Sequence, residues 1–370
     1  MIYLDHHATT PVLPEAVAAM LPFFTEFAGN PSSAHAAGRK ARQALEEARE
    51  RIARCLDAFP DEVVFTSGAT ESNNLAVYGL AGEPPGQVIS SPLEHPCVME
   101  PLKHLASRGF VVDFLPVSPT GLVNSDAPIP ADTHLLTLML VNHETGAVQP
   151  VAELARRFPQ VAFHVDAAQA VGKIPVSFHQ LGFSTLSASG HKFGAPKGIG
   201  VLLVRRGVTL RPLFHGGHQQ QGRRPGTEPV ALAVGMATAL ELACSRMTEA
   251  LATVRQLRTQ FIAALEAGAS PIVVNGPEDG SPYVANISFP GCRADLLLMK
   301  LDLAGIACST GSACSSGSLL PSPVLMAMNV SAERLHSAMR FSFSSRMTIA
   351  EIDNASERII RCVNMLRLTR

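Results

Sequence analysis

The chain has 370 residues, of which 46% are hydrophobic and 16% are charged, and it contains 28 Gly and 27 Pro. This composition indicates a compact, loop-rich globular protein and excludes disordered, coiled-coil and collagen-like chains. Thirty basic and 31 acidic residues give a net charge of -1, so the surface as a whole has no basic field that would attract nucleic acid or an anionic membrane.

The sequence also argues against several locations and cofactors. Its start lacks the basic and apolar regions of a signal peptide, and no run approaches the length of a membrane-spanning helix, so we expect a cytoplasmic protein. Seven cysteines without a Cys-x-x-Cys pair predict neither a disulfide framework nor a zinc module. His6 and His7 have no further ligands at suitable spacing, so we expect no metal site.

The first half of the chain reads as an α/β pattern. An amphipathic helix is predicted within 33–56, with Ser32 or Ser33 as its N-cap. Short β-rich runs, separated mostly by helix-compatible segments, follow at 63–66, 88–90, 111–115, 135–141, 161–165, 185–189 and 201–204. Apolar strands that alternate with helices predict a largely parallel, seven-stranded sheet covered on both faces.

Beyond residue 211 the pattern changes. We predict one long helix over 231–265, strands over 284–289 and 339–344, and helices over 296–301 and 324–328. The last helix opens with the capping box Thr348-x-x-Glu351. We therefore expect an N-terminal arm (1–15) that packs with the small domain, a large α/β domain (16–252) and a smaller α+β domain (253–370).

Three strand ends carry polar groups, and ligands of open α/β sheets bind at such ends. The turn Thr66–Glu71 before a helix offers N–H groups to an anion, although an ordinary turn has the same composition. Asp166 follows another strand and could also be a helix N-cap. Lys192 follows a third, and it could be an amine nucleophile or a surface lysine. Together, a phosphate cradle, an acid for a pyridine nitrogen and a Schiff-base lysine are the groups that pyridoxal phosphate requires.

Ordered motifs along the whole chain resemble those of the group I cysteine desulfurases, which are fold-type I, class V aminotransferase-like enzymes. The matching segments are 3–11, 29–33, 66–74, 94–95, 164–169, 189–192, 224–228, 311–318 and 339–342. The resemblance implies a large domain with a mostly parallel seven-stranded sheet and a smaller α+β domain. It also implies a pyridoxal 5'-phosphate-dependent removal of sulfur from L-cysteine that yields L-alanine and an enzyme persulfide.

The resemblance implies a role for each matched site residue. Lys192 would bind the cofactor covalently, His95 would stack on its ring and assist proton transfer, and Cys314 would be the nucleophile that carries the persulfide. Asp166 would pair with the pyridine nitrogen and Gln169 with the phenolic oxygen. The other implied cofactor-binding residues are Ala69, Thr70, His143, Ser189, His191 and Thr227, the last from the second subunit of a homodimer. The implied substrate-binding residues are Asn30 and Arg340, of which Arg340 would clamp the substrate carboxylate.

Some features leave alternatives open. The small-residue segment 307–318, which contains Cys308 and Cys314, predicts a mobile loop, but a linker with incidental cysteines or a reversible disulfide would have the same composition. His143 stands where the family commonly has an amide, so its protonation is expected to add a pH dependence. His218 stands where the family commonly has a glycine, so the resemblance does not define the path of its loop.

The persulfide would supply a sulfur-acceptor protein for iron–sulfur cluster assembly or tRNA thiolation. Selenocysteine lyase and a non-catalytic sulfur-carrying scaffold remain alternative functions.

Overall fold

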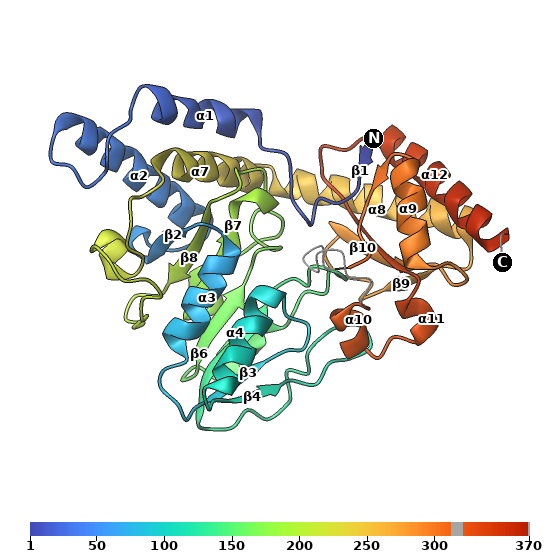
Figure 1. The fold of residues 1–370 in the computed structure, drawn as a ribbon, viewed down its shortest axis with the longest axis horizontal. Helices are drawn as coiled ribbons and strands as arrows, with labels where there is room; N and C mark the ends of the chain where they lie inside the picture. The colour runs from blue at the N-terminus through green and yellow to red at the C-terminus, as the bar shows by residue number, and fades with distance from the viewer. Residues whose placement is uncertain (312–320, 369–370) are drawn as a thin grey trace.

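The computed structural model describes residues 1–311 and 321–368, and the predicted nucleophile Cys314 lies outside them. The described chain forms a larger α/β part and a smaller α+β part, and helix α8 (Met247–Ala269) runs from one to the other (Figure 1).

A seven-stranded sheet forms the centre of the larger part. Its strands are β2 (Val63–Thr66), β3 (Gln87–Ser90), β4 (Val111–Phe114), β5 (Thr133–Met139), β6 (Ala162–Asp166), β7 (Thr185–Ser189) and β8 (Gly200–Val204). The spatial order is β2-β8-β7-β6-β5-β3-β4, and only β8 runs antiparallel to its neighbours. The predicted sheet, mostly parallel and with seven strands, is therefore confirmed.

Helices cover both faces of this sheet. They are α1 (Pro14–Thr25), α2 (Ala36–Cys55), α3 (Ala69–Leu80), α4 (Pro96–Ser107), α5 (Val151–Arg157), α6 (Phe178–Leu181) and α7 (Val230–Ser245), with 3-10 turns η1 (Pro60–Glu62), η2 (Gly190–Lys192) and η3 (Gln219–Gly222). Successive residues of a strand point to opposite faces. Phe65 accordingly belongs to the core under α2 and α7, whereas Val64 packs with residues of α3.

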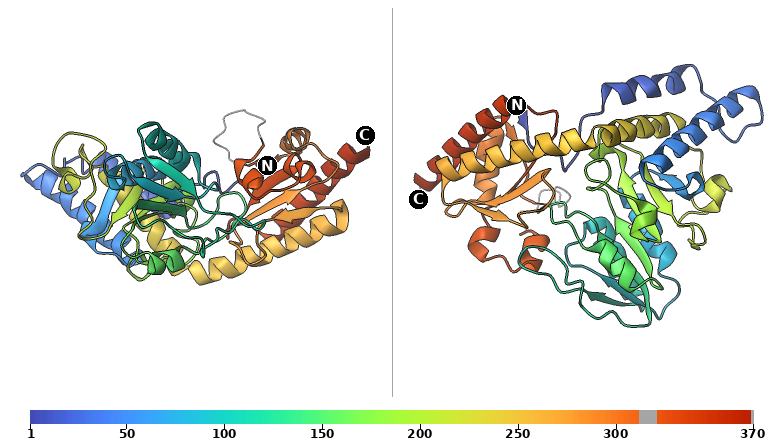
Figure 2. Two further views of the ribbon diagram at one scale, coloured as in Figure 1. Left: turned by 90° about the horizontal axis from the view of Figure 1, so that it is seen from below. Right: turned by 180° about the vertical axis from the view of Figure 1, so that it is seen from behind.

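The smaller part combines α8 with a three-stranded antiparallel sheet and short helices. Its remaining elements are β9 (Val273–Asn275), β10 (Val284–Ser288), α9 (Ala294–Leu303), β11 (Ile306–Ala307), α10 (Pro323–Ala327), α11 (Ala332–Leu335), β12 (Ala338–Ser342) and α12 (Ile349–Leu368). The N-terminal strand β1 (Ile2–Tyr3) pairs with β11, so the start of the chain lies against this part (Figure 2). Leu4 is buried in its core. The domain limits given above remain a prediction.

Two local predictions are corrected. The helix expected over 231–265 is two helices, because the chain bends by 71° between α7 and α8 at Arg246. The N-cap of α2 is His35, whose Nδ1 accepts from the N–H of Gly38 at 3.2 Å, and not Ser32 or Ser33. The capping box of α12 is confirmed, since Thr348 Oγ1 accepts from the N–H of Glu351.

No single helix of the described chain is both long enough and apolar enough to cross a membrane. Taken as a pair, α7 and α8 meet that test by length and composition, but with the 71° bend between them.

Candidate active site

The carboxyl ends of β6 and β7 bring Asp166 and Lys192 to one edge of the sheet. β6 ends at Asp166, which pairs in register with Ser187 of β7. β7 ends at Ser189 and leads directly into η2, whose last residue is Lys192. Two groups that the sequence placed after separate strands therefore lie together, as expected for adjacent parallel strands.

A buried hydrogen-bond network orients the Asp166 carboxylate. Asn73 of α3 donates its Nδ2 to Oδ2 at 2.7 Å, and the N–H of Ala168 donates to Oδ1 at 2.9 Å. Asn73 Oδ1 in turn lies 2.9 Å from His164 Nε2 and accepts from Ser187 Oγ at 2.5 Å. Burial lowers the pKa of His164 to about 3, so its ring is neutral at physiological pH. Asn73 and His164 lie in matched segments, but their positioning role depends on contacts that the sequence does not display.

The N-terminal arm closes over the Lys192 side chain. Lys192 Nζ donates to the carbonyl oxygens of His7 at 2.5 Å and Ala8 at 3.0 Å. Gln169 Nε2 donates to the same His7 oxygen at 2.9 Å. Thr10 fixes the arm to η2, because its N–H and its hydroxyl both donate to the carbonyl of His191. Lys192 and Gln169 are thus held side by side under the arm.

The N-terminus of α3 forms an anion cradle. Among the described residues no side chain caps this helix, so the N–H groups of Ala69 and Thr70 in its first turn are available to a ligand. The turn before it comes close to β8, because a Cβ on Gly200 would lie 2.6 Å from the Cα of Gly68. Ser189 Oγ lies 3.6 Å from the position that a Cβ on Gly68 would take, so the cradle also faces the end of β7. Its donors suit a phosphate dianion.

His95 is the N-cap of α4 and lies within the electrostatic range of the other site groups. Its Nδ1 accepts from the N–H of Cys97 at 3.2 Å. Burial lowers the pKa of His95, the Asp166 carboxylate opposes this, and Lys192 and Arg340 lower the pKa further. The ring is therefore a neutral base near neutral pH.

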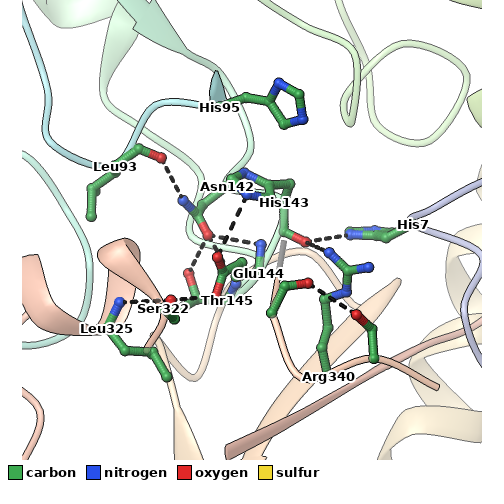
Figure 3. Close-up of polar contacts among 12 residues, drawn as sticks. His7, Leu93, His95, Asn142, His143, Glu144, Thr145, Ser322, Leu325 and Arg340 are labelled. Carbon is green, nitrogen blue, oxygen red and sulfur yellow. Dashed lines mark hydrogen bonds and ion pairs between the residues drawn. The ribbon is translucent and has the colours of Figure 1, made fainter. Parts of the chain in front are cut away.

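His143 follows β5 and packs its ring edge-on against His95, with centroids 5.3 Å apart (Figure 3). Its carbonyl oxygen lies 3.1 Å from His7 Nδ1 and 3.4 Å from Arg340 Nη1. Burial, followed by His95, Arg340 and Lys192, lowers the pKa of the His143 ring well below its ordinary value. The expected pH dependence from His143 is therefore not supported, because a fully buried imidazole beside other positive groups stays neutral.

Neither ring nitrogen of His143 has a hydrogen-bond partner within the described residues. We therefore expect His143→Asn to keep activity within about threefold and to leave the acid limb of kcat/KM unchanged. The pKa of His143 is lower in the folded protein than in the unfolded chain, so the neutral ring favours the folded state above about pH 6.5. As the pH falls below this value, the unfolded chain binds a proton that the folded protein does not, and the stabilisation is lost. Urea unfolding from pH 7 to 5 should show a smaller loss of stability in the variant. A displaced acid limb would show that His143 titrates in the working range.

Arg340 of β12 is buried between the N-terminal arm and the segment that contains Ser309. It is 2% exposed, and its Nη2 forms an ion pair with Asp5 Oδ1 at 3.0 Å. Its backbone exchanges two hydrogen bonds with Ser309. Within residues 1–311 and 321–368 its Nε has no hydrogen-bond partner, so the guanidinium retains a donor for a further carboxylate. Asp5 belongs to a matched segment, but the sequence prediction assigned it no role.

The described chain does not gather every predicted site residue. Asn30 is exposed between α1 and α2, and its Oδ1 accepts from the nearby N–H of Ser32. Thr227 is exposed in the loop before α7. The path of the preceding loop is defined despite His218, because the amide of Gln220 bonds both the N–H and the carbonyl of Phe65. The assigned roles of Asn30, Thr227 and Cys314 remain predictions.

Residues 2–355 match the family model of the class-V aminotransferases. The chain belongs to this family. The cysteine desulfurase IscS of Dictyoglomus turgidum is 42% identical over 375 residues, covering 99% of this chain and 95% of its own. A solved NifS-like protein is 35% identical with a TM-score of 0.92, covering 98% of this chain and 99% of its own. The structure of SspA in complex with cysteine is 34% identical with a TM-score of 0.84, covering 94% and 100%. The predicted resemblance and fold class are confirmed.

Proposed function

We propose that this chain is a pyridoxal 5'-phosphate-dependent cysteine desulfurase whose Cys314 receives the sulfur of L-cysteine as a persulfide. The predicted enzyme class is confirmed by cysteine desulfurase relatives that match nearly the full chain. The observation that carries the site proposal is the grouping of Lys192, Asp166 and the uncapped start of α3 at one edge of the sheet.

The residues present fit the cofactor. A bound pyridoxal phosphate supplies an electron sink that acidifies the substrate α carbon. Lys192 would hold it covalently, and Asp166, oriented by Asn73, would keep a proton on the ring nitrogen. Gln169 would hydrogen-bond its phenolic oxygen, and His143 would lie near the cofactor and the substrate. The phosphate would be held by Ala69, Thr70, Ser189 and His191.

The remaining steps use the chain's own groups. Arg340 would bind the carboxylate of cysteine, for which its planar fork is suited. The Lys192 amine would be released when the amino group of cysteine takes its place on the cofactor, and it would then take the α proton, with neutral His95 assisting the proton transfer. The Cys314 thiolate would then attack the substrate sulfur, so that a sulfur–sulfur bond forms as the Cβ–sulfur bond breaks. The electron pair stays with carbon, which is protonated to the methyl group of alanine.

We also propose a homodimer in which Thr227 reaches the phosphate of the neighbouring subunit. An exposed apolar stripe on α1, formed by Val17, Leu21 and Phe24, supports an interface near this end of the larger part.

Thr227→Ala should weaken cofactor binding by about one to three kcal/mol, the range for a hydrogen bond to a charged group. Cofactor release on dilution, measured by absorbance, checks this result. Light scattering that finds a monomer with full cofactor and full activity would contradict the composite site.

The decisive experiment incubates the purified holoenzyme with L-cysteine and measures alanine together with protein-bound persulfide, in equal amounts in a first turnover. Candidate acceptor proteins from iron–sulfur assembly and tRNA thiolation then report where the sulfur goes. Turnover of selenocysteine alone would favour a selenocysteine lyase, and no turnover of either amino acid would favour a sulfur-carrying scaffold. A cytoplasmic location stays a prediction.

A further inference from the structure

A cavity of about 380 Å³ lies beside the N-terminal arm, and the start of α3 does not contribute to its wall. Its walls come from the arm, the α7–α8 junction and the chain just before α12. It shares Lys192 with the candidate site, but Ala69, Thr70, Asp166 and Ser189 do not line it. Its volume falls in the range of small-molecule pockets.

A buried lysine lies in the wall of this cavity. Lys173 is 4% exposed, and its Nζ donates to Gln169 Oε1 at 2.6 Å. No ion pair of Lys173 is found within residues 1–311 and 321–368. Burial, followed by the charges of Lys192 and Arg340, lowers the pKa of Lys173 well below its ordinary value. Its Nζ lies 5.7 Å from the centroid of the Tyr283 ring, and a bound carboxylate would supply the counter-charge that favours the ammonium form.

Further positive charge lines the cavity on the exposed side. The exposed side chains of Arg246 and Arg346 belong to its wall, and the described part of the chain offers neither an ion pair. Glu351 also lines the cavity, but its Oε2 accepts from the N–H and the hydroxyl of Thr348 in the cap of α12. Cations thus outweigh carboxylates along the wall.

Part of the remaining wall is apolar. Phe193, Tyr283 and Phe343 line it and are each at least nine-tenths buried. Such a surface favours the apolar body of a ligand, whereas Lys173 favours one negative charge. A carboxylate would form a neutral pair with a single ammonium, whereas a phosphate dianion would leave a charge to desolvate.

We propose that this cavity is a second ligand site, which binds an organic carboxylate with an apolar body through Lys173 and the arginines at its mouth. The site is linked to the candidate active site, because Gln169 bonds both Lys173 and the His7 carbonyl that also accepts from Lys192.

The test titrates the holoenzyme with phenylacetate and, as an uncharged control, phenylacetamide, using ligand-observed NMR. We expect saturable binding of phenylacetate with a Kd of about 1 mM or tighter, and binding of the amide at least about tenfold weaker. Equal binding of both compounds, or no saturable binding of phenylacetate, would overturn the proposal.

Variants locate the binding. Lys173→Met removes the amine, and Ala250→Phe fills the cavity from α8 without changing any charge. Each variant should therefore bind phenylacetate about tenfold or more weakly than the wild type does. Lys103→Met, at an exposed lysine of α4, is the matched control and should bind as the wild type does. Arg340→Met distinguishes this site from the substrate site. The variant should no longer change its spectrum when cysteine is added, but it should bind phenylacetate as the wild type does. Binding that depends on Arg340 and survives both Lys173→Met and Ala250→Phe would refute the second site.

Discussion

Lys192→Ala should abolish turnover, with a loss of at least about a thousandfold, and should remove the visible absorbance of the lysine–cofactor adduct. The carbonyls of His7 and Ala8 hold Lys192 Nζ beneath the arm, so the alanine variant loses the amine from this position. The variant should still fold and retain some cofactor, since Asp166 and the start of α3 are unchanged. Absorbance spectra and an alanine assay of the purified variant measure both effects.

The position of the adduct provides an independent check on this result. Borohydride reduction of the holoenzyme, followed by peptide mapping, should place the cofactor on Lys192. Lys197→Ala is the matched control, because that lysine is exposed and follows the same strand by a few residues. An adduct on Lys197 or on the buried Lys173 would show that the site has been assigned to the wrong amine.

The sequence predicted those parts of the site that follow directly from a strand end. Asp166 and Lys192 come after buried strands, and the α/β pattern alone brings such positions to one edge of the sheet. Two residues that act through distant contacts were not assigned. Asn73 meets Asp166 across 93 positions, and Asp5 meets Arg340 across 335. Their significance depends on the folded geometry, which local patterns do not encode.

The errors in secondary structure also have physical reasons. α7 is apolar nearly all round, so its pattern continues without interruption into α8, and the break at Arg246 has no Gly or Pro to mark it. His35 caps α2 through a ring nitrogen, whereas the usual expectation is a hydroxyl or a carboxylate. Strands β1 and β11 have two residues each, which is too short for alternation to be recognised.

The two cysteines of segment 307–318 should behave differently. Cys308 is partly buried against the core of the smaller part, and burial, with a further contribution from Asp5, raises the pKa of its thiol despite the opposing effect of Arg340. A thiol with a raised pKa stays protonated and is a poor nucleophile at neutral pH. Cys308→Ser should therefore retain activity within about threefold, as expected for a residue outside the chemistry.

Cys314→Ser should lose persulfide formation and sustained alanine production by at least about a thousandfold, because a serine hydroxyl is not ionised at neutral pH and cannot replace a thiolate. The variant should still bind the cofactor and change its spectrum when cysteine is added, since Lys192 and Arg340 are intact. Mass spectrometry of the protein after one turnover, with Cys308→Ser as the matched control, separates the two thiols. Persulfide that is absent in Cys308→Ser and present in Cys314→Ser would assign the nucleophile to Cys308. If both variants still cleaved the carbon–sulfur bond but released pyruvate, ammonia and free sulfide in place of alanine and persulfide, sulfur would leave the substrate by β-elimination without either thiol.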